Sequence, residues 1–193
     1  GTGKTSITGG VAASLALMGH RVLCIDMDIG LRNLDITLGL SDRALMDFSD
    51  VALGRCPLAR GAVDHPDVKG LSLLTAPMSL SPSLTIDKVR AMLDTARGQY
   101  DYILIDSPAG LGAGFRLAIC GADRALVIAT NDASSLRDAQ RTVCELESIR
   151  QVHLIMNRIQ PKLLRKLRAT IDDAMNTAGL PLIGVVPEDD QVM

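Results

Sequence analysis

A glycine, a lysine and a hydroxyl side chain follow one another directly at Gly3, Lys4 and Thr5, within the opening Gly-Thr-Gly-Lys-Thr-Ser. These residues match the last three positions of the phosphate-binding pattern G-x-x-x-x-G-K-[ST]. In that pattern backbone N–H groups meet phosphate oxygens at a helix start, the lysine neutralises the β- and γ-phosphates, and the hydroxyl binds Mg²⁺. Because the same tripeptide occurs by chance at ordinary helix starts, the nucleotide interpretation needs other residues to support it.

Carboxylates end two of the apolar runs that follow. Asp26 and Asp28 come at the end of the first run, and Asp106 ends a later one, before the loop Ser-Pro-Ala-Gly that closes at Gly110. An aspartate in this place suits the support of Mg²⁺ through water, and a glycine-containing loop suits a γ-phosphate contact. Strand-end aspartates also cap the helices that follow them. Beside a Gly-Lys-Thr helix, their number favours the nucleotide interpretation over that alternative.

Asn157 ends another apolar run, in Leu-Ile-Met-Asn-Arg. Guanine-specific proteins need an aspartate soon after such an asparagine, and the segment from Arg158 to Pro161 contains none. Adenine is therefore favoured over guanine. The alternative is an asparagine that only forms a turn before Pro161.

Apolar strand-like runs and helical patterns, the elements that must position these residues, alternate along the chain. No linker or internal repeat lies between them. The continuous apolar runs predict buried strands, and the crossovers between them predict a parallel sheet. We therefore expect an α/β fold of the P-loop NTPase class, a doubly wound, mostly parallel sheet with helices on both faces, forming one domain over residues 1–193. The expected strands are 21–26, 71–75, 102–106, 125–130, 152–156 and 182–186, and the expected helices are 11–18, 44–53, 85–96, 112–120, 135–149 and 163–178.

Composition excludes several classes of function. Twenty basic against 22 acidic residues give a net charge of −2, so no global positive field exists to hold nucleic acid. The longest uncharged stretch, from Thr5 to Gly19, is shorter than the roughly 20 apolar residues of a membrane span. Four widely separated cysteines, with no secretory signal, favour reduced thiols and a cytoplasmic protein over disulfides or a cysteine-bound metal.

Four further segments resemble the deviant Walker A group of P-loop proteins, the ParA/MinD family, and in particular its MinD-type branch. Residues 25–35, Ile-Asp-Met-Asp-Ile-Gly-Leu-Arg-Asn-Leu-Asp, are similar to the first switch of that branch almost letter for letter. Residues 106–110 resemble its second switch, residues 184–189 resemble the segment that lines the adenosine, and residues 136–138 match a stretch near the dimer face. The similarity covers essentially the whole chain.

The resemblance implies an ATP-binding and ATP-hydrolysing switch that positions the cell-division septum. ATP and Mg²⁺ would promote a homodimer that binds division-site proteins of the MinC and MinE type and, in the full-length protein, the inner face of the cell membrane. Nucleic acid is not an expected partner. The nucleotide-binding residues implied are Gly1, Thr2, Gly3, Lys4, Thr5, Ser6, Asp26, Gly110, Asn157, Pro187 and Asp189, with Thr5 and Asp106 at Mg²⁺ and with Asp28 and Lys4 in catalysis, Asp28 orienting the attacking water.

The chain also departs from the family pattern. A further lysine that reaches the partner subunit's nucleotide would lie two positions before Gly1, after a first strand that is also missing. The membrane-binding helix of the family would lie beyond Met193, and Asn131-Asp132-Ala133 replaces the usual Pro-Glu-Val. We therefore expect a fragment, truncated at both ends, that hydrolyses ATP poorly by itself.

Other functions on the same scaffold stay open as alternatives. A ParA-like partition ATPase would need a basic stripe for DNA, which the near-neutral charge disfavours. A flagellar-number regulator usually has a different first switch. An iron–sulfur carrier would need paired cysteines, and Cys120 and Cys144 lack that spacing. A metabolic ligase or kinase would need a second polar site, for which the sequence offers no candidate cluster.

Overall fold

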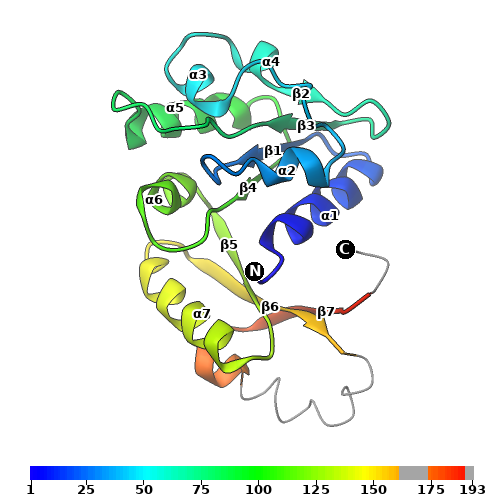
Figure 1. Cartoon of the computed structure of the whole chain (residues 1–193), viewed down its shortest axis with the longest axis vertical. Helices are drawn as coiled ribbons and strands as arrows, with labels where there is room; N and C mark the ends of the chain where they lie inside the picture. The colour runs from blue at the N-terminus through cyan, green and yellow to red at the C-terminus, as the bar shows by residue number, and fades with distance from the viewer. Residues whose placement is uncertain (161–173, 190–193) are drawn as a thin grey trace. The chain divides into compact units, whose positions relative to one another are not determined.

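The computed structural model describes residues 1–160 and 174–189, drawn in colour in Figure 1. The chain forms two compact units, and each is described by itself. One unit contains Lys4–Gly121, and the other contains Gly1–Gly3 together with the chain from Ala122 onward. The prediction of one domain over residues 1–193 stays a prediction.

The unit of Lys4–Gly121 is built on a four-stranded sheet in the order β2-β3-β1-β4. Strands β3 (Leu71–Leu74), β1 (Val22–Asp26) and β4 (Tyr102–Asp106) run parallel, and the short β2 (Val63–Asp64) pairs antiparallel with β3. All residues of β1 and β3 are buried, as expected for strands of a parallel sheet that is covered on both faces. The α/β class with parallel-dominated sheets is confirmed.

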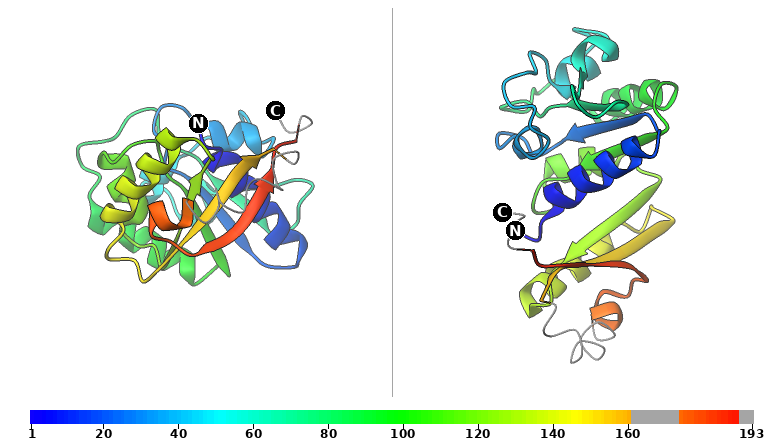
Figure 2. Two further views of the ribbon diagram at one scale, coloured as in Figure 1. Left: turned by 90° about the horizontal axis from the view of Figure 1, so that it is seen from below. Right: turned by 90° about the vertical axis from the view of Figure 1, so that its right-hand side faces the viewer.

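Side chains of β1 alternate between two apolar cores, because successive residues of a strand point to opposite faces of the sheet. Val22 and Cys24 pack with α1 (Lys4–Leu17) and α2 (Asn33–Thr37). Leu23 and Ile25 pack with α3 (Phe48–Ala52), α4 (Leu58–Gly61), α5 (Ile86–Arg97) and α6 (Ala113–Ile119). Helices therefore cover both faces of this sheet, and the right-hand view of Figure 2 shows α1 on one side of β1.

The other unit contains a three-stranded parallel sheet in the order β5-β6-β7. Its strands are β5 (Arg124–Ala129), β6 (Gln151–Ile159) and β7 (Leu182–Pro187), and helix α7 (Ala133–Glu145) packs on β5. Asp132 caps α7, because its carboxylate accepts a hydrogen bond from the Ser135 N–H at 2.9 Å. Pairing between β6 and β7 is irregular after Leu154 and again after Met156.

The predicted strands are all present, and the predicted helices differ from expectation mainly in their limits. The short elements α2, α4 and β2 were not predicted. The first helix begins at Lys4 rather than Val11, and the helix predicted over 44–53 begins only at Phe48. Of the helix predicted over 163–178, residues 174–178 are helical and the rest lies outside the described residues. Within residues 1–160 and 174–189, no helix combines the length and the apolar character that a bilayer crossing requires.

Candidate functional site

Two buried aspartates lie side by side at the carboxyl end of the four-stranded sheet. In the register of the parallel pair β1 and β4, Asp26 is the direct partner of Asp106. The pairing continues one residue further, since the Met27 N–H donates to the Asp106 carbonyl at 3.0 Å. Only 1% of Asp26 and 2% of Asp106 is exposed. Open α/β sheets bind their ligands at this edge, so two carboxylates buried there mark a candidate site.

Asp26 organises the loop that follows β1. One of its carboxylate oxygens accepts from the Asp28 N–H at 2.8 Å, and the other accepts from the Leu34 N–H at 3.1 Å. Burial raises the pKa of Asp26, and the two N–H donors oppose that rise by stabilising the ionised form. The carboxylate therefore holds both ends of residues 28–34 against the strand end, which is a positioning function.

Burial strongly perturbs the Asp106 carboxylate at the end of β4. Burial raises its pKa from 3.8 to about 6, the charges of Asp26 and Asp28 act in the same direction, and the Thr5 hydroxyl opposes the shift by a hydrogen bond. Its Oδ1 is buried and, within the described part of the chain, has no hydrogen-bond partner. A buried carboxylate with an unpartnered oxygen beside a threonine hydroxyl fits a hard cation such as Mg²⁺.

Protein ligands to such a cation would be few. Among residues 1–160 and 174–189, no group of three or more His, Cys, Asp or Glu side chains is arranged to hold a metal ion. Mg²⁺ in nucleotide sites is usually held by one or two protein groups, with phosphate and water oxygens completing its shell. Thr5 and Asp106 fit that pattern.

Lys4 and Asp28 complete the charged group around Asp106. Lys4 is the first residue of α1, and its ammonium lowers the pKa of Asp106 by its positive charge. Asp28 follows β1 by two residues and is half-buried. The structure thus brings together, within one unit, five of the residues predicted from sequence: Lys4, Thr5, Asp26, Asp28 and Asp106.

Gly114, near the start of α6, lies against both of the loops predicted as switches. A Cβ at this position would lie 3.0 Å from the Ile29 Cδ1 atom and 3.0 Å from the Pro108 Cγ atom. Ile29 belongs to the loop after β1 and Pro108 to the loop after β4. Gly110, in the same loop as Pro108, is exposed and has φ +82°, a left-handed conformation that favours glycine. Ser6 lies exposed on the first turn of α1.

The remaining predicted residues lie in the other unit. Asn157 is buried near the end of β6, and its amide Nδ2 donates to the Thr2 carbonyl at 2.8 Å. Pro187 pairs with Ile159, two residues beyond Asn157, so the end of β7 lies beside the end of β6. Gly1 and Asp189 are both exposed. This unit thus contains Thr2, Gly3, Asn157 and Pro187.

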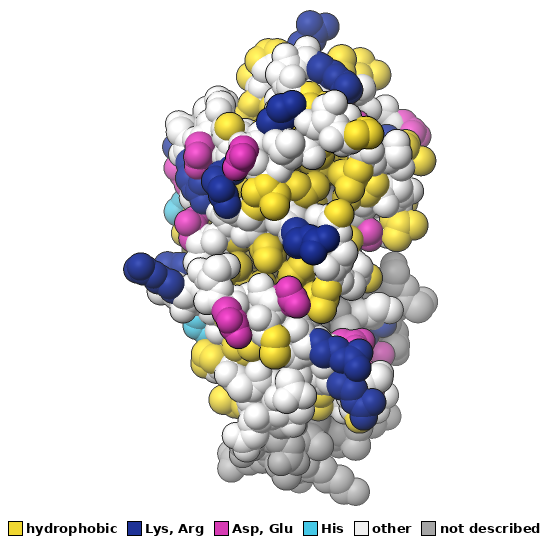
Figure 3. Space-filling model, turned by 90° about the vertical axis from the view of Figure 1, so that its left-hand side faces the viewer, with side chains coloured by type: hydrophobic (Ala, Val, Ile, Leu, Met, Phe, Trp, Pro, Cys, Tyr) yellow, Lys and Arg dark blue, Asp and Glu magenta, His cyan; other side chains and the backbone are white. Residues whose placement is uncertain are grey.

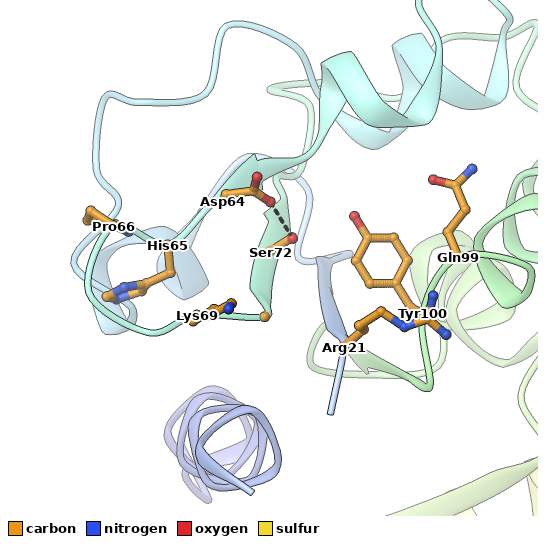
Figure 4. Close-up of a pocket in the computed structure, with 9 residues that line it drawn as sticks. Arg21, Asp64, His65, Pro66, Lys69, Ser72, Gln99 and Tyr100 are labelled. Atoms are coloured by element: carbon orange, nitrogen blue, oxygen red, sulfur yellow. Dashed lines mark hydrogen bonds between the residues drawn. The ribbon is translucent and has the colours of Figure 1, made fainter. Parts of the chain in front are cut away.

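Figure 4 shows a hollow in the Lys4–Gly121 unit that contains none of these residues. It is lined by Arg21, which precedes β1, and by Tyr100, which precedes β4, together with side chains of β2 and β3. The Ser72 hydroxyl donates to the Asp64 carboxylate across its wall at 2.7 Å. Because Arg21 lies at the start of β1 and Asp26 at its end, the hollow is at the opposite edge of the sheet from the carboxylates.

Sequence reasoning missed two backbone groups of this arrangement. The Leu34 N–H and the Thr2 carbonyl each bond a predicted side chain, Asp26 and Asn157 respectively. Backbone groups carry no sequence signal of their own. Two residues in the sequence pointed to these contacts. They are Gly3, which follows Thr2, and Asn157, the polar residue that ends its apolar run.

The whole chain, residues 1–193, matches the family described as the CobQ/CobB/MinD/ParA nucleotide binding domain. The septum site-determining protein MinD of Helicobacter pylori is 40% identical over 204 residues, covering 100% of this chain and 76% of the relative. Among solved structures, the MinC:MinD cell division protein complex of Aquifex aeolicus matches with a TM-score of 0.88 and 37% identity, covering 99% of this chain and 78% of that one.

A second solved structure carries a ligand. The septum site-determining protein MinD of Pyrococcus horikoshii, complexed with Mg-ADP, matches with a TM-score of 0.80 and 26% identity. That match covers 98% of this chain and 77% of the other. The likeness therefore includes residues of both units and the segments that contain the candidate site.

Proposed function

The chain belongs to the MinD family of septum-site-determining ATPases, within the CobQ/CobB/MinD/ParA nucleotide-binding group, and from that premise we propose how its own residues act. ATP binds with Mg²⁺ at the carboxyl edge of the four-stranded sheet. The observation that carries the proposal is the pairing of Asp26 with Asp106 at the end of the sheet, where Thr5 and Lys4 lie near enough to lower the pKa of Asp106. These contacts place a lysine, a hydroxyl and two buried carboxylates at the start of one helix.

Each of these side chains has its own role in nucleotide binding, which follows from its chemistry. Lys4 neutralises charge on the β- and γ-phosphates, and the backbone of Gly1–Ser6 donates N–H groups to phosphate oxygens. The Thr5 hydroxyl would ligate Mg²⁺, and Asp106 would support the ion through water. When bound, Mg²⁺ neutralises charge that develops on the phosphate oxygens during transfer. Pro187 and Asp189 line the adenosine, with Asn157 at the neighbouring strand end.

Hydrolysis needs an attacking water in line with the γ-phosphate, and phosphoryl transfer asks the protein chiefly for positioning and charge. Asp28 orients that water. Its backbone N–H is held by Asp26 at 2.8 Å, so the loop that carries Asp28 is anchored on the buried strand end. Contact of the γ-phosphate with this loop and with Gly110 orders both switches, and they loosen after hydrolysis.

Other proteins bind the ATP-bound form of the switch. We propose that the ATP-bound form is a homodimer that binds a division-site partner of the MinC type, since the related Aquifex aeolicus protein is in a MinC:MinD complex. In its full-length form it associates with the membrane from the cytoplasm. On the face drawn in Figure 3, basic side chains are interspersed with acidic ones rather than forming one stripe. The net charge of −2 over the whole sequence favours protein partners over DNA.

Mg²⁺-dependent ATP turnover by the complete gene product that contains these residues tests the proposal. Lys4→Ala should abolish turnover because the phosphate charge is left unneutralised. Lys69→Ala, at an exposed lysine on the opposite edge of the same sheet, is the matched control and should keep the wild-type rate. The absence of Mg²⁺-dependent ATP binding and hydrolysis in the complete gene product would overturn the proposal.

A further inference from the structure

The strand β6 contains one extra residue between Met156 and Ile159. Met156 pairs with Val185 of β7, but the next pair is Ile159 with Pro187, so three steps along β6 match two along β7. Arg158 absorbs the difference with a left-handed backbone, φ +55°. A bulge of this kind re-aims a neighbouring side chain, and such bulges are frequent beside functional sites.

The side chain so re-aimed is buried and bonded to the opening turn of the chain. Asn157 is 6% exposed, and its amide Nδ2 donates to the Thr2 carbonyl at 2.8 Å. Gly3 lies against the same nitrogen, since a Cβ at that position would come within 2.3 Å of it, and its φ of +88° also excludes most other residues. The hydrogen bond joins residues 155 positions apart. Asn157 is therefore not a local turn-forming asparagine.

Anchoring the Thr2 carbonyl fixes the direction of the next N–H. A peptide unit is planar and trans, so the C=O of Thr2 and the N–H of Gly3 point in opposite directions. When Asn157 holds the oxygen on one side, the Gly3 N–H must face the other side. Gly3 is the glycine that directly precedes Lys4 in the phosphate-binding pattern.

We propose that Asn157 is a positioning residue for the phosphate-binding turn: its amide holds the Thr2 carbonyl so that the Gly3 N–H is presented to a phosphate. The inference rests on the proposed nucleotide function and deepens it, because the residue acts on any triphosphate, whatever its base. An asparagine that only recognised adenine would act on the base and leave base-free phosphates unaffected.

Inorganic tripolyphosphate separates the two roles, because it carries the phosphates and no base. Its affinity is measured by displacement of a fluorescent ATP analogue from the complete gene product, in parallel with ATP and GTP. Asn157→Ala should lower the affinity for tripolyphosphate and the affinity for ATP by a similar factor, about tenfold for the loss of one buried hydrogen bond. Asn176→Ala, at an exposed asparagine of the same unit, is the matched control and should leave both affinities unchanged.

Gly3→Ala provides the second test. Its added methyl group meets the Asn157 amide, so tripolyphosphate should bind more weakly to this variant as well. In the Asn157→Ala background the same substitution should cost less affinity, because the clash is relieved, and such non-additivity marks residues in contact. Thermal unfolding of each variant verifies that the fold is kept, and Asn157→Asp, which keeps the size but has no N–H to donate to the Thr2 carbonyl, decides if Asn157→Ala does not fold.

The outcomes are distinguishable. If Asn157→Ala weakens ATP but not tripolyphosphate, the residue reads the base and the inference is wrong. If neither affinity changes, the hydrogen bond has no role in binding and the inference is also wrong. If the wild-type protein binds neither ligand, the proposed nucleotide function itself fails.

Discussion

Asp106→Asn should stabilise the nucleotide-free protein while it removes the support for Mg²⁺. Burial raises the pKa of Asp106 from 3.8 to about 6, so at pH 8 the folded protein holds an unfavourable buried charge. The difference between these pKa values corresponds to about 3 kcal/mol of unfolding free energy. Asparagine removes that charge and keeps the shape. For a chain of this size, about 3 kcal/mol corresponds to a rise of about 6–12 °C in Tm.

The sign of the pH dependence follows from the same values. Between pH 4 and 6 the folded protein binds more protons at Asp106 than the unfolded chain does, so this group's contribution to stability falls as the pH rises through that window. The Tm gap between Asp106→Asn and wild type should therefore be largest at pH 7–8 and shrink as the pH approaches 4. Differential scanning calorimetry without nucleotide measures it.

Asp106→Asn should weaken Mg²⁺-dependent nucleotide binding, although it raises the stability of the nucleotide-free protein. Wild-type protein gains ATP affinity on addition of Mg²⁺, and Asp106→Asn should lose that gain, as measured by titration calorimetry. Asp67→Asn, at an exposed carboxylate, is the control and should alter neither Tm nor affinity. A variant that is less stable than wild type at pH 8, or that keeps the full Mg²⁺ effect, would refute the reasoning.

Asp28→Ala should keep ATP binding and lower turnover by about 100-fold or more, because only the water loses its orientation; an unchanged steady-state rate would contradict that role. Asp47→Ala should cost about 1–2 kcal/mol in urea unfolding, because the carboxylate caps α3 through the Ser49 and Asp50 N–H groups. The exposed Cys144 thiol should react quickly with Ellman's reagent, whereas Cys24, whose burial raises its pKa to about 12, should react only after unfolding. Rapid labelling of Cys24 in the native protein would show that β1 is not buried.

The strands were predictable because continuous apolar runs are a local property of the sequence. Val22–Asp26 and Tyr102–Asp106 needed nothing beyond their composition and length. The helix α2 was missed because it has five residues and begins after Arg32, a residue at φ +50° with no side-chain cap. The strand β2 was missed because it has only two residues, which carry no periodicity. Only its antiparallel pairing with β3 defines it as a strand.

The site was predictable in its residue types but not in its contacts. Carboxylates after apolar runs indicated Asp26 and Asp106, yet their direct pairing depends on the register of β1 with β4, which joins residues 80 positions apart. The bulge that turns Asn157 toward Thr2 likewise depends on the pairing of β6 with β7. Register and bulges arise from long-range packing, which a local pattern does not encode.

The position of the bound metal is the decisive test of the proposed nucleotide site. A crystal of the complete gene product grown with Mn²⁺ in place of Mg²⁺ and a non-hydrolysable ATP analogue locates the ion by its anomalous signal. We expect one peak within ligand distance of the Thr5 hydroxyl and one water away from Asp106, with the triphosphate along residues 1–6. A metal and nucleotide bound instead in the hollow beside Arg21 and Tyr100 would contradict it.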